Sequence, residues 1–216
     1  MTSILEVEQL DTLSSNASST LTIGGTNTTT INLGASGKSI VIPSGATLTN
    51  NGTASGFGGI TEADTWMVTG TFQNVSNGVD EVKTSNWSRQ VAPTYGSFSK
   101  IGTGMSESSG IFTFPSTGIY HVTWNSYFDL SQATSAASIK IQVSNNGGSN
   151  YVTQAVSGCG SDPNRGQTVN AQTFVDVTST SNVKVRFLTN GGTYINWFGD
   201  ANATYTYATF VRLGDT

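Results

Sequence analysis

The chain has 216 residues, of which only 10% are charged and more than a quarter are serine or threonine, and its formal net charge is −4. Average proteins carry about 25% charged residues, and a nucleic-acid-binding protein carries a basic surface, so this composition argues against a nucleic-acid partner. The single cysteine rules out a disulfide within the chain. No apolar run approaches the roughly 20 residues that cross a bilayer, so no membrane partner is expected.

Residues 1–10 contain no basic segment and carry Glu6 and Glu8. This pattern is not that of a secretory signal peptide, and we expect synthesis in a cytoplasm. Ile4, Val7 and Leu10 have helical spacing, whereas Leu5 and Val7 have strand spacing, so the conformation here stays open.

Residues 1–60 contain one aromatic residue, Phe57. Apolar pairs at a spacing of two predict short repeated β-strands; they are Leu21 with Ile23, Ile31 with Leu33, and Ile40 with Ile42, followed by Leu48. A few short strands bury little apolar area within one chain. We therefore expect this segment to dock on a partner or on copies of the chain. The alternative is a polar linker. The Gly-rich stretch 50–59 marks a boundary between a docking segment, 1–60, and a head domain, 61–216.

The head domain shows alternating apolar residues and no helical period. Strands are predicted around residues 66–72, 111–114, 120–124, 139–143, 174–177, 183–188, 194–198 and 205–213, and Asn145-Asn146-Gly147-Gly148 predicts a hairpin turn. Eight to ten such strands indicate an all-β fold, an antiparallel jelly-roll sandwich.

The last predicted strand carries bulky residues on both faces. Tyr205, Tyr207 and Val211 share one face, and Phe210 lies on the other. A strand with one solvated face alternates more cleanly, so these four residues are candidates for a subunit interface.

The segment 110–120 carries the pattern Gly-φ-Phe-Thr-x-Pro-x-x-Gly-φ-Tyr, with Phe112, Pro115, Gly118 and Tyr120 at the matching places. It resembles the globular-head domain of the complement first component. The resemblance spans about residues 65–216 and implies a jelly roll of the tumour-necrosis-factor type, assembled as a tight homotrimer. Residues 1–60 depart from that family, since they contain no collagen repeat.

Residues 30–38, 41–48 and 4–10 instead resemble segments of marine and cyanobacterial bacteriophage virion proteins. This resemblance implies a virion location, with the N-terminal segment docking on capsid or tail proteins. The candidate docking residues are Ile4, Leu5, Val7 and Leu10.

Few residues offer chemistry. His121 stands alone in a strand pattern, without the nucleophile elbow that a triad needs, and Cys159 is interpreted as a small residue in a turn. The candidate carboxylates for glycan hydrolysis, Asp80 and Glu81, are adjacent on an expected loop. We therefore predict no catalytic residue and no enzyme.

Two weak binding signals remain. Residues 200–204 place oxygen ligands two apart, as calcium loops do, but lack the downstream Gly and Glu; a bound calcium is thus an option and no other cofactor is expected. Tyr194 and Trp197 could line a glycan pocket.

Three functions fit these observations. The first is a trimeric capsid-decoration protein, of the cement or head-fibre kind. The second is a tail-fibre protein that attaches to a host surface glycan or protein. A glycan-active enzyme is a remote third.

Overall fold

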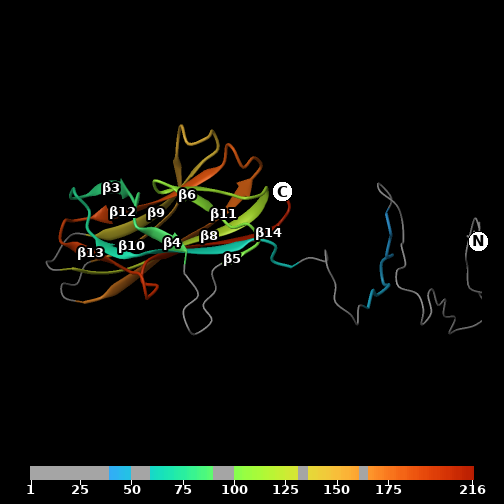
Figure 1. The fold of residues 1–216 in the computed structure, drawn as a ribbon, viewed down its shortest axis with the longest axis horizontal. Coiled ribbons are helices and arrows are strands. Elements are labelled where there is room, and N and C mark those ends of the chain that lie inside the picture. Colours follow the sequence, from blue (N-terminus) through green and yellow to red (C-terminus); the bar gives the residue numbers. More distant parts are fainter. Residues whose placement is uncertain (1–38, 50–58, 90–99, 131–135, 161–164) are drawn as a thin grey trace, which may run out of the picture. The chain divides into compact units, whose positions relative to one another are not determined.

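The computed structural model describes residues 39–49, 59–89, 100–130, 136–160 and 165–216 (Figure 1). The chain divides into two units, Met1–Ser55 and Gly56–Thr216. Among the described residues, no helix has the length and apolar character needed to cross a bilayer.

Residues 39–49 are the described part of the first unit. They contain no strand, and a turn is closed by the Ala46 N–H, which donates to the Pro43 carbonyl at 3.0 Å. The strand expected at Ile40–Ile42 is therefore not formed, because a strand needs a paired neighbour and no described residue pairs with this segment. The other expected strands of residues 1–60, and the docking residues Ile4, Leu5, Val7 and Leu10, lie outside the described residues.

The described residues of the second unit form fourteen strands and no helix, and the strands pair antiparallel in two sheets. The eight-stranded sheet contains β1 (Ala63–Val68), β2 (Gly70–Phe72), β4 (Trp87–Arg89), β5 (Lys100–Ile101), β8 (Gly118–Leu130), β11 (Gln167–Val177), β13 (Ile195–Asp200) and β14 (Tyr207–Gly214). The six-stranded sheet contains β3 (Val79–Val82), β6 (Ser106–Ser108), β7 (Ile111–Thr113), β9 (Ala137–Ser144), β10 (Val152–Cys159) and β12 (Lys184–Gly191). The predicted all-β sandwich is thus confirmed.

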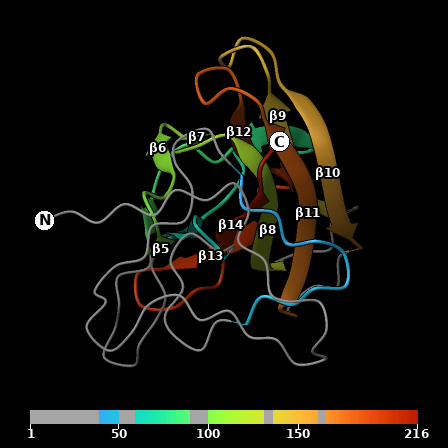
Figure 2. The ribbon, with the colours of Figure 1, turned by 90° about the vertical axis from the view of Figure 1, so that its right-hand side faces the viewer.

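The long strand β8 organises the eight-stranded sheet. Along one edge it pairs with β11, and along the other it pairs first with β14 and then with β13. In the six-stranded sheet β12 lies between β9 on one edge and β7 and β3 on the other. The edge strands β10 and β11 lie side by side (Figure 2). Strand β2 pairs with β13 at one end of the eight-stranded order, and β3 pairs with β12 on the edge opposite to β9.

The core fills the space between the sheets with aromatic rings. Phe112 packs on Phe187 at 5.4 Å and on Phe210 at 5.3 Å between ring centroids. Trp124 lies 5.1 Å from Phe187, and all four side chains are buried. These rings come from β7, β8, β12 and β14, so both sheets contribute to one core.

Residues of the Gly110–Tyr120 pattern contribute to this core and to the turns that lead into β7 and β8. Gly110 and Gly118 have φ angles of +81° and +136°, which glycine adopts without strain. A Cβ on Gly118 would lie 2.4 Å from the Gly214 carbonyl oxygen, so β8 starts close to the end of β14. Phe112 and Tyr120 are core residues, and the Tyr120 hydroxyl lies 2.8 Å from that of Ser116.

Candidate interaction face

The outward face of the eight-stranded sheet is built by alternation along β8, β11 and β14. In each strand every second residue points into the core, and its neighbours point outward. Because the register is regular between β8 and β11 and between β8 and β14 as far as Arg212, the outward side chains form rows across the three strands. We call this surface the outer face.

The middle of the outer face is polar. Tyr207 pairs with Asn125, which pairs with Asn170, and the Asn170 amide donates to the Asn125 side-chain oxygen. In the next row the hydroxyls of Thr123 and Thr209 form a hydrogen bond between β8 and β14.

Aromatic and apolar side chains lie toward both ends of the outer face. At one end the rings of Tyr127, Phe198 and Tyr205 lie 5.2 to 6.0 Å apart between centroids. At the other end the His121 ring lies 5.2 Å from that of Phe174, beside Val211 in the same row.

Several of these apolar groups remain open to solvent. Phe174 is 67% exposed, Leu213 58% and Tyr205 42%. A hollow of about 330 Å³ lies beside Phe174 and is lined by His121, Gln172 and Thr173 as well. A strand face of this kind is suited to contact with another protein surface.

The candidate interface residues fall in two groups. Tyr205, Tyr207 and Val211 belong to the outer face, half-buried or exposed. Phe210 is 1% exposed and packs in the core against Phe112. Its assignment to an interface is therefore wrong, because its side of β14 faces the second sheet.

The suggested Tyr194–Trp197 pocket is not formed as expected. Trp197 is fully buried, and its indole N–H donates to the Asn74 side-chain oxygen at 2.7 Å. Tyr194 is 42% exposed and precedes β13. Trp197 is thus a core residue, since its hydrogen-bonding group is satisfied inside the protein.

The residues considered for chemistry take structural positions. Asp80 and Glu81 lie in β3 rather than on a loop; Asp80 pairs with the Lys140 ammonium at 2.6 Å, and the Glu81 oxygens accept the N–H groups of Val75 and Ser76 at 3.0 and 2.7 Å. The Lys140 and Asn190 hydrogen bonds lower the pKa of Asp80 against the opposing effect of burial. Both carboxylates are therefore engaged by the protein itself.

Cys159 ends strand β10 instead of lying in a turn, and its thiol lies 2.9 Å from the Gln167 side-chain oxygen. Burial raises the pKa of this thiol, which disfavours the reactive thiolate.

The residues of the possible calcium loop form a turn in which the Asp200 carboxylate accepts the Asn202 N–H at 2.7 Å. Across the described ranges, no group of three His, Cys, Asp or Glu side chains is arranged to hold a metal ion. Calcium binding stays a prediction.

The geometry defines the class: an antiparallel jelly roll of the tumour-necrosis-factor type. Solved structures share this fold. Murine APRIL at pH 8.5 superimposes with a TM-score of 0.50 over 70% of this chain and 98% of that chain, at 10% identity. Murine APRIL at pH 8.0 gives the same values. Eiger TNF from S. frugiperda has a TM-score of 0.47 at 13% identity, covering 71% of this chain and 93% of that chain.

At such identities the likeness concerns the fold alone. No protein-family model and no curated protein sequence matches this chain.

Proposed function

We propose that this protein is a non-enzymatic, trimeric structural protein of a bacteriophage virion surface, which decorates the capsid. In this proposal the jelly roll projects outward and residues 1–60 dock on capsid proteins. Three chains meet through the outer face of the eight-stranded sheet.

The main support for a trimer is the exposed apolar surface of the outer face. Phe174, Tyr205 and Leu213 expose large apolar surfaces on one side of a sheet whose other side is the core. Burial of apolar surface contributes roughly 25 cal/mol for each Å² removed from water. These exposed side chains would therefore stabilise an assembly that covers them. Cyclic association of identical chains covers such a face and leaves no open edge for further growth.

Docking by the N-terminal segment is supported by its own described residues. Ile40, Val41 and Leu48 are all exposed in residues 39–49. Exposed aliphatic side chains such as these gain stability when a partner covers them. Together with the resemblance of residues 30–38 and 41–48 to phage virion proteins, this favours the capsid as the partner.

Two measurements test the proposal. Mass photometry of the purified chain should give three times the mass of one chain, and a monomer at micromolar concentration would rule out the trimer. Electron microscopy of assembled particles, with an antibody against the head, should place the protein on the capsid. A label at the tail tip alone would instead favour the second candidate.

That second candidate is a tail-fibre protein which binds a host glycan. The observation in its favour is a small polar pocket around Lys83, lined with hydroxyl groups. The two candidates share the fold and the trimer, and they differ in position on the particle.

A further inference from the structure

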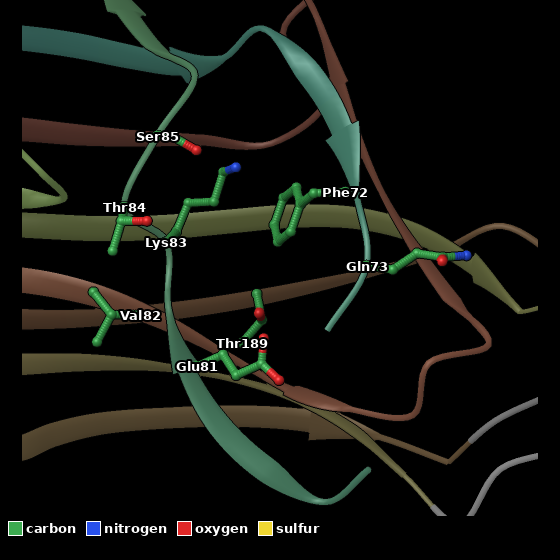
Figure 3. A pocket seen from close by; sticks show the side chains of 8 residues that line it. All are labelled: Phe72, Gln73, Glu81, Val82, Lys83, Thr84, Ser85 and Thr189. Carbon is green, nitrogen blue, oxygen red and sulfur yellow. The ribbon is translucent and has the colours of Figure 1, made fainter. Parts of the chain in front are cut away.

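A cavity of about 200 Å³ lies on the side of the sandwich where β2 of one sheet faces β3 of the other, at the β3–β4 crossover (Figure 3). It is lined by Phe72, Gln73, Glu81, Val82, Lys83, Thr84, Ser85 and Thr189. The strand orders place it away from the β10–β11 side. None of these lining residues belongs to the outer face.

Lys83 is the unusual residue of this pocket. Only 6% of the residue is exposed, and its ammonium lies 4.0 Å from the centroid of the Phe72 ring. In the described part of the chain, no oxygen or nitrogen acceptor forms a hydrogen bond or an ion pair with this ammonium. Its three N–H donors therefore face the cavity with no acceptor among the described residues.

A buried charge without a partner is costly, and proteins normally pair it. The Phe72 ring compensates only in part, since a cation–π contact contributes about 0.5–2 kcal/mol. Burial lowers the pKa of Lys83 to about 8. An anionic group of a ligand that enters the cavity would therefore stabilise the ammonium form of Lys83.

Glu81 does not provide that anionic group. Its two oxygens accept the N–H groups of Val75 and Ser76, which fixes the carboxylate away from Lys83. In Figure 3 the Lys83 amine lies toward Phe72 and Ser85, whereas the Glu81 carboxylate lies at the other end, beside Thr189. The pocket is therefore cationic at one end and rich in acceptors at the other.

Neighbouring contacts hold this arrangement in place. Phe72 stacks on the buried Trp197 at 6.3 Å between centroids. Asn74 accepts from Trp197 and donates to the Thr189 carbonyl at 3.1 Å, which ties β12 to the segment after β2. The Lys83 N–H donates to the Phe187 carbonyl at 2.9 Å. The walls are thus set by the core and need no ligand to form.

The lining selects for a small polar occupant. A volume of about 200 Å³ is below the roughly 300–1,000 Å³ of pockets for drug-sized molecules. Thr84, Ser85 and Thr189 offer hydroxyl groups that can both donate and accept, and Glu81 keeps lone pairs that accept from ligand hydroxyls. These groups match a molecule with a carboxylate at one end and hydroxyl groups at the other.

We propose that this pocket binds one residue of a polyhydroxy acid, such as a uronic acid, with its carboxylate on the Lys83 ammonium and the neighbouring Ser85 hydroxyl, and its hydroxyls on Thr189 and Glu81. The inference concerns ligand binding by each chain and stands whether or not the protein is trimeric or part of a virion.

Titration by NMR or calorimetry of the full chain at pH 7 tests this, with sodium D-glucuronate as the probe. D-glucose carries the hydroxyls without the charge, and sodium acetate and inorganic phosphate carry charge without the ring hydroxyls. Glucuronate should bind at least tenfold more tightly than each of these three. Equal binding of glucuronate and acetate, tighter binding of phosphate, or no binding of glucuronate would overturn the proposal.

Matched variants locate the site. Lys83→Met keeps a long apolar side chain in the pocket and should weaken glucuronate binding at least tenfold. Lys140→Met removes a surface lysine that pairs with Asp80 and should leave binding unchanged. Unchanged binding by Lys83→Met, with a melting temperature no lower than that of the parent, would show that glucuronate binds elsewhere.

The pH profile gives an independent readout. Glu81 is the other ionisable side chain that lines the pocket. Binding requires the ammonium form of Lys83, whose free-state pKa is about 8, so the affinity should fall by about tenfold between pH 7 and pH 9. An affinity that stays constant over this range would contradict the role of Lys83.

Discussion

At the scale of single residues, the protein keeps a lysine where lysines are rarely found. Lys83 is enclosed by the edges of both sheets and faces the Phe72 ring. Unfolded chains hold the ammonium in water with a pKa near 10.4, and in the folded protein the pKa is about 8. The folded state therefore binds this proton less tightly than the unfolded state does.

We expect Lys83→Met to raise the free energy of unfolding at pH 7 by about 1–2 kcal/mol, because it removes a desolvated charge but loses the cation–π contact. The cost of the charge is fully present below pH 8, shrinks as the pH rises through 10.4, and vanishes above it, where both states are neutral. The difference between variant and parent should therefore shrink over that interval.

Urea unfolding at pH 7 and at pH 10 measures this difference. Lys100→Met, at an exposed lysine that donates to the Thr103 carbonyl, is the control and should change stability little at either pH. A Lys83→Met protein that is less stable than the parent at pH 7 would show that the ammonium is stabilised in the fold.

At the scale of elements, a buried carboxylate joins three segments of the head. Asp64 in β1 accepts the Trp66 indole N–H at 2.9 Å and the Met105 N–H at 2.7 Å. It also pairs with Arg89 of β4 at 3.0 Å, and the Arg89 guanidinium lies 4.5 Å from the Trp66 ring. Arg89 also donates to the Met105 carbonyl, so the segment before β6 is tied to β1 by Asp64 and to β4 by Arg89.

Asp64→Ala should lower the free energy of unfolding by about 3–5 kcal/mol, because it leaves a part-buried guanidinium and two N–H groups without their acceptor. Thermal unfolding followed by circular dichroism measures the loss. Asp215→Ala removes the exposed partner of Arg212 and should cost less than about 1 kcal/mol. Equal effects of the two variants would mean that the Asp64 network contributes no more than a surface ion pair.

At the scale of the whole molecule, the proposal depends on which surfaces are covered by other chains. The outer face has aromatic groups toward both ends and a polar middle in which Tyr207 lies in the row of Asn125 and Asn170. If three chains meet here, Tyr207 approaches its symmetry copies.

We expect Tyr207→Asp to abolish the trimer or to lower its melting temperature strongly, because three carboxylates would be brought together and lose hydration without partners. Val156→Asp is the control: Val156 is 57% exposed in β10, on the other sheet, and its substitution should leave the trimer intact. Sedimentation and thermal unfolding distinguish the two. A Tyr207→Asp protein with unchanged mass and melting temperature would move the interface away from this row.

Removal of residues 1–60 should leave a folded head that no longer joins the particle. Among the described residues, those of the core lie between Ala63 and Phe210, and the deletion removes none of them. Near-ultraviolet circular dichroism should show the tertiary signal of the full chain, and co-sedimentation with particles should be lost. Decoration of particles by the shortened chain would contradict the docking role of residues 1–60.

The sequence by itself determined the fold class and much of the core. Alternating residues along 120–124, 139–143 and 183–188 specify strands with one buried face, because the side-chain period of a strand is two wherever it lies. The pattern from Gly110 to Tyr120 indicated the jelly roll through a family resemblance; the structure adds that both of its glycines have positive φ angles and that Phe112 and Tyr120 are buried. Such signals are local, and they can be read without knowing the partner of any strand.

Only the tertiary structure decided which bulky residue faces which surface. Phe210 and Trp197 are aromatic residues in strand patterns, as residues of an interface or a pocket would also be. In the structure both are buried in the core. The short strands β3 and β4, and with them the Lys83 pocket, depend on pairing with strands that are not their neighbours in sequence. Burial and charge at such positions are set by contacts across the sandwich, which a one-dimensional pattern does not contain.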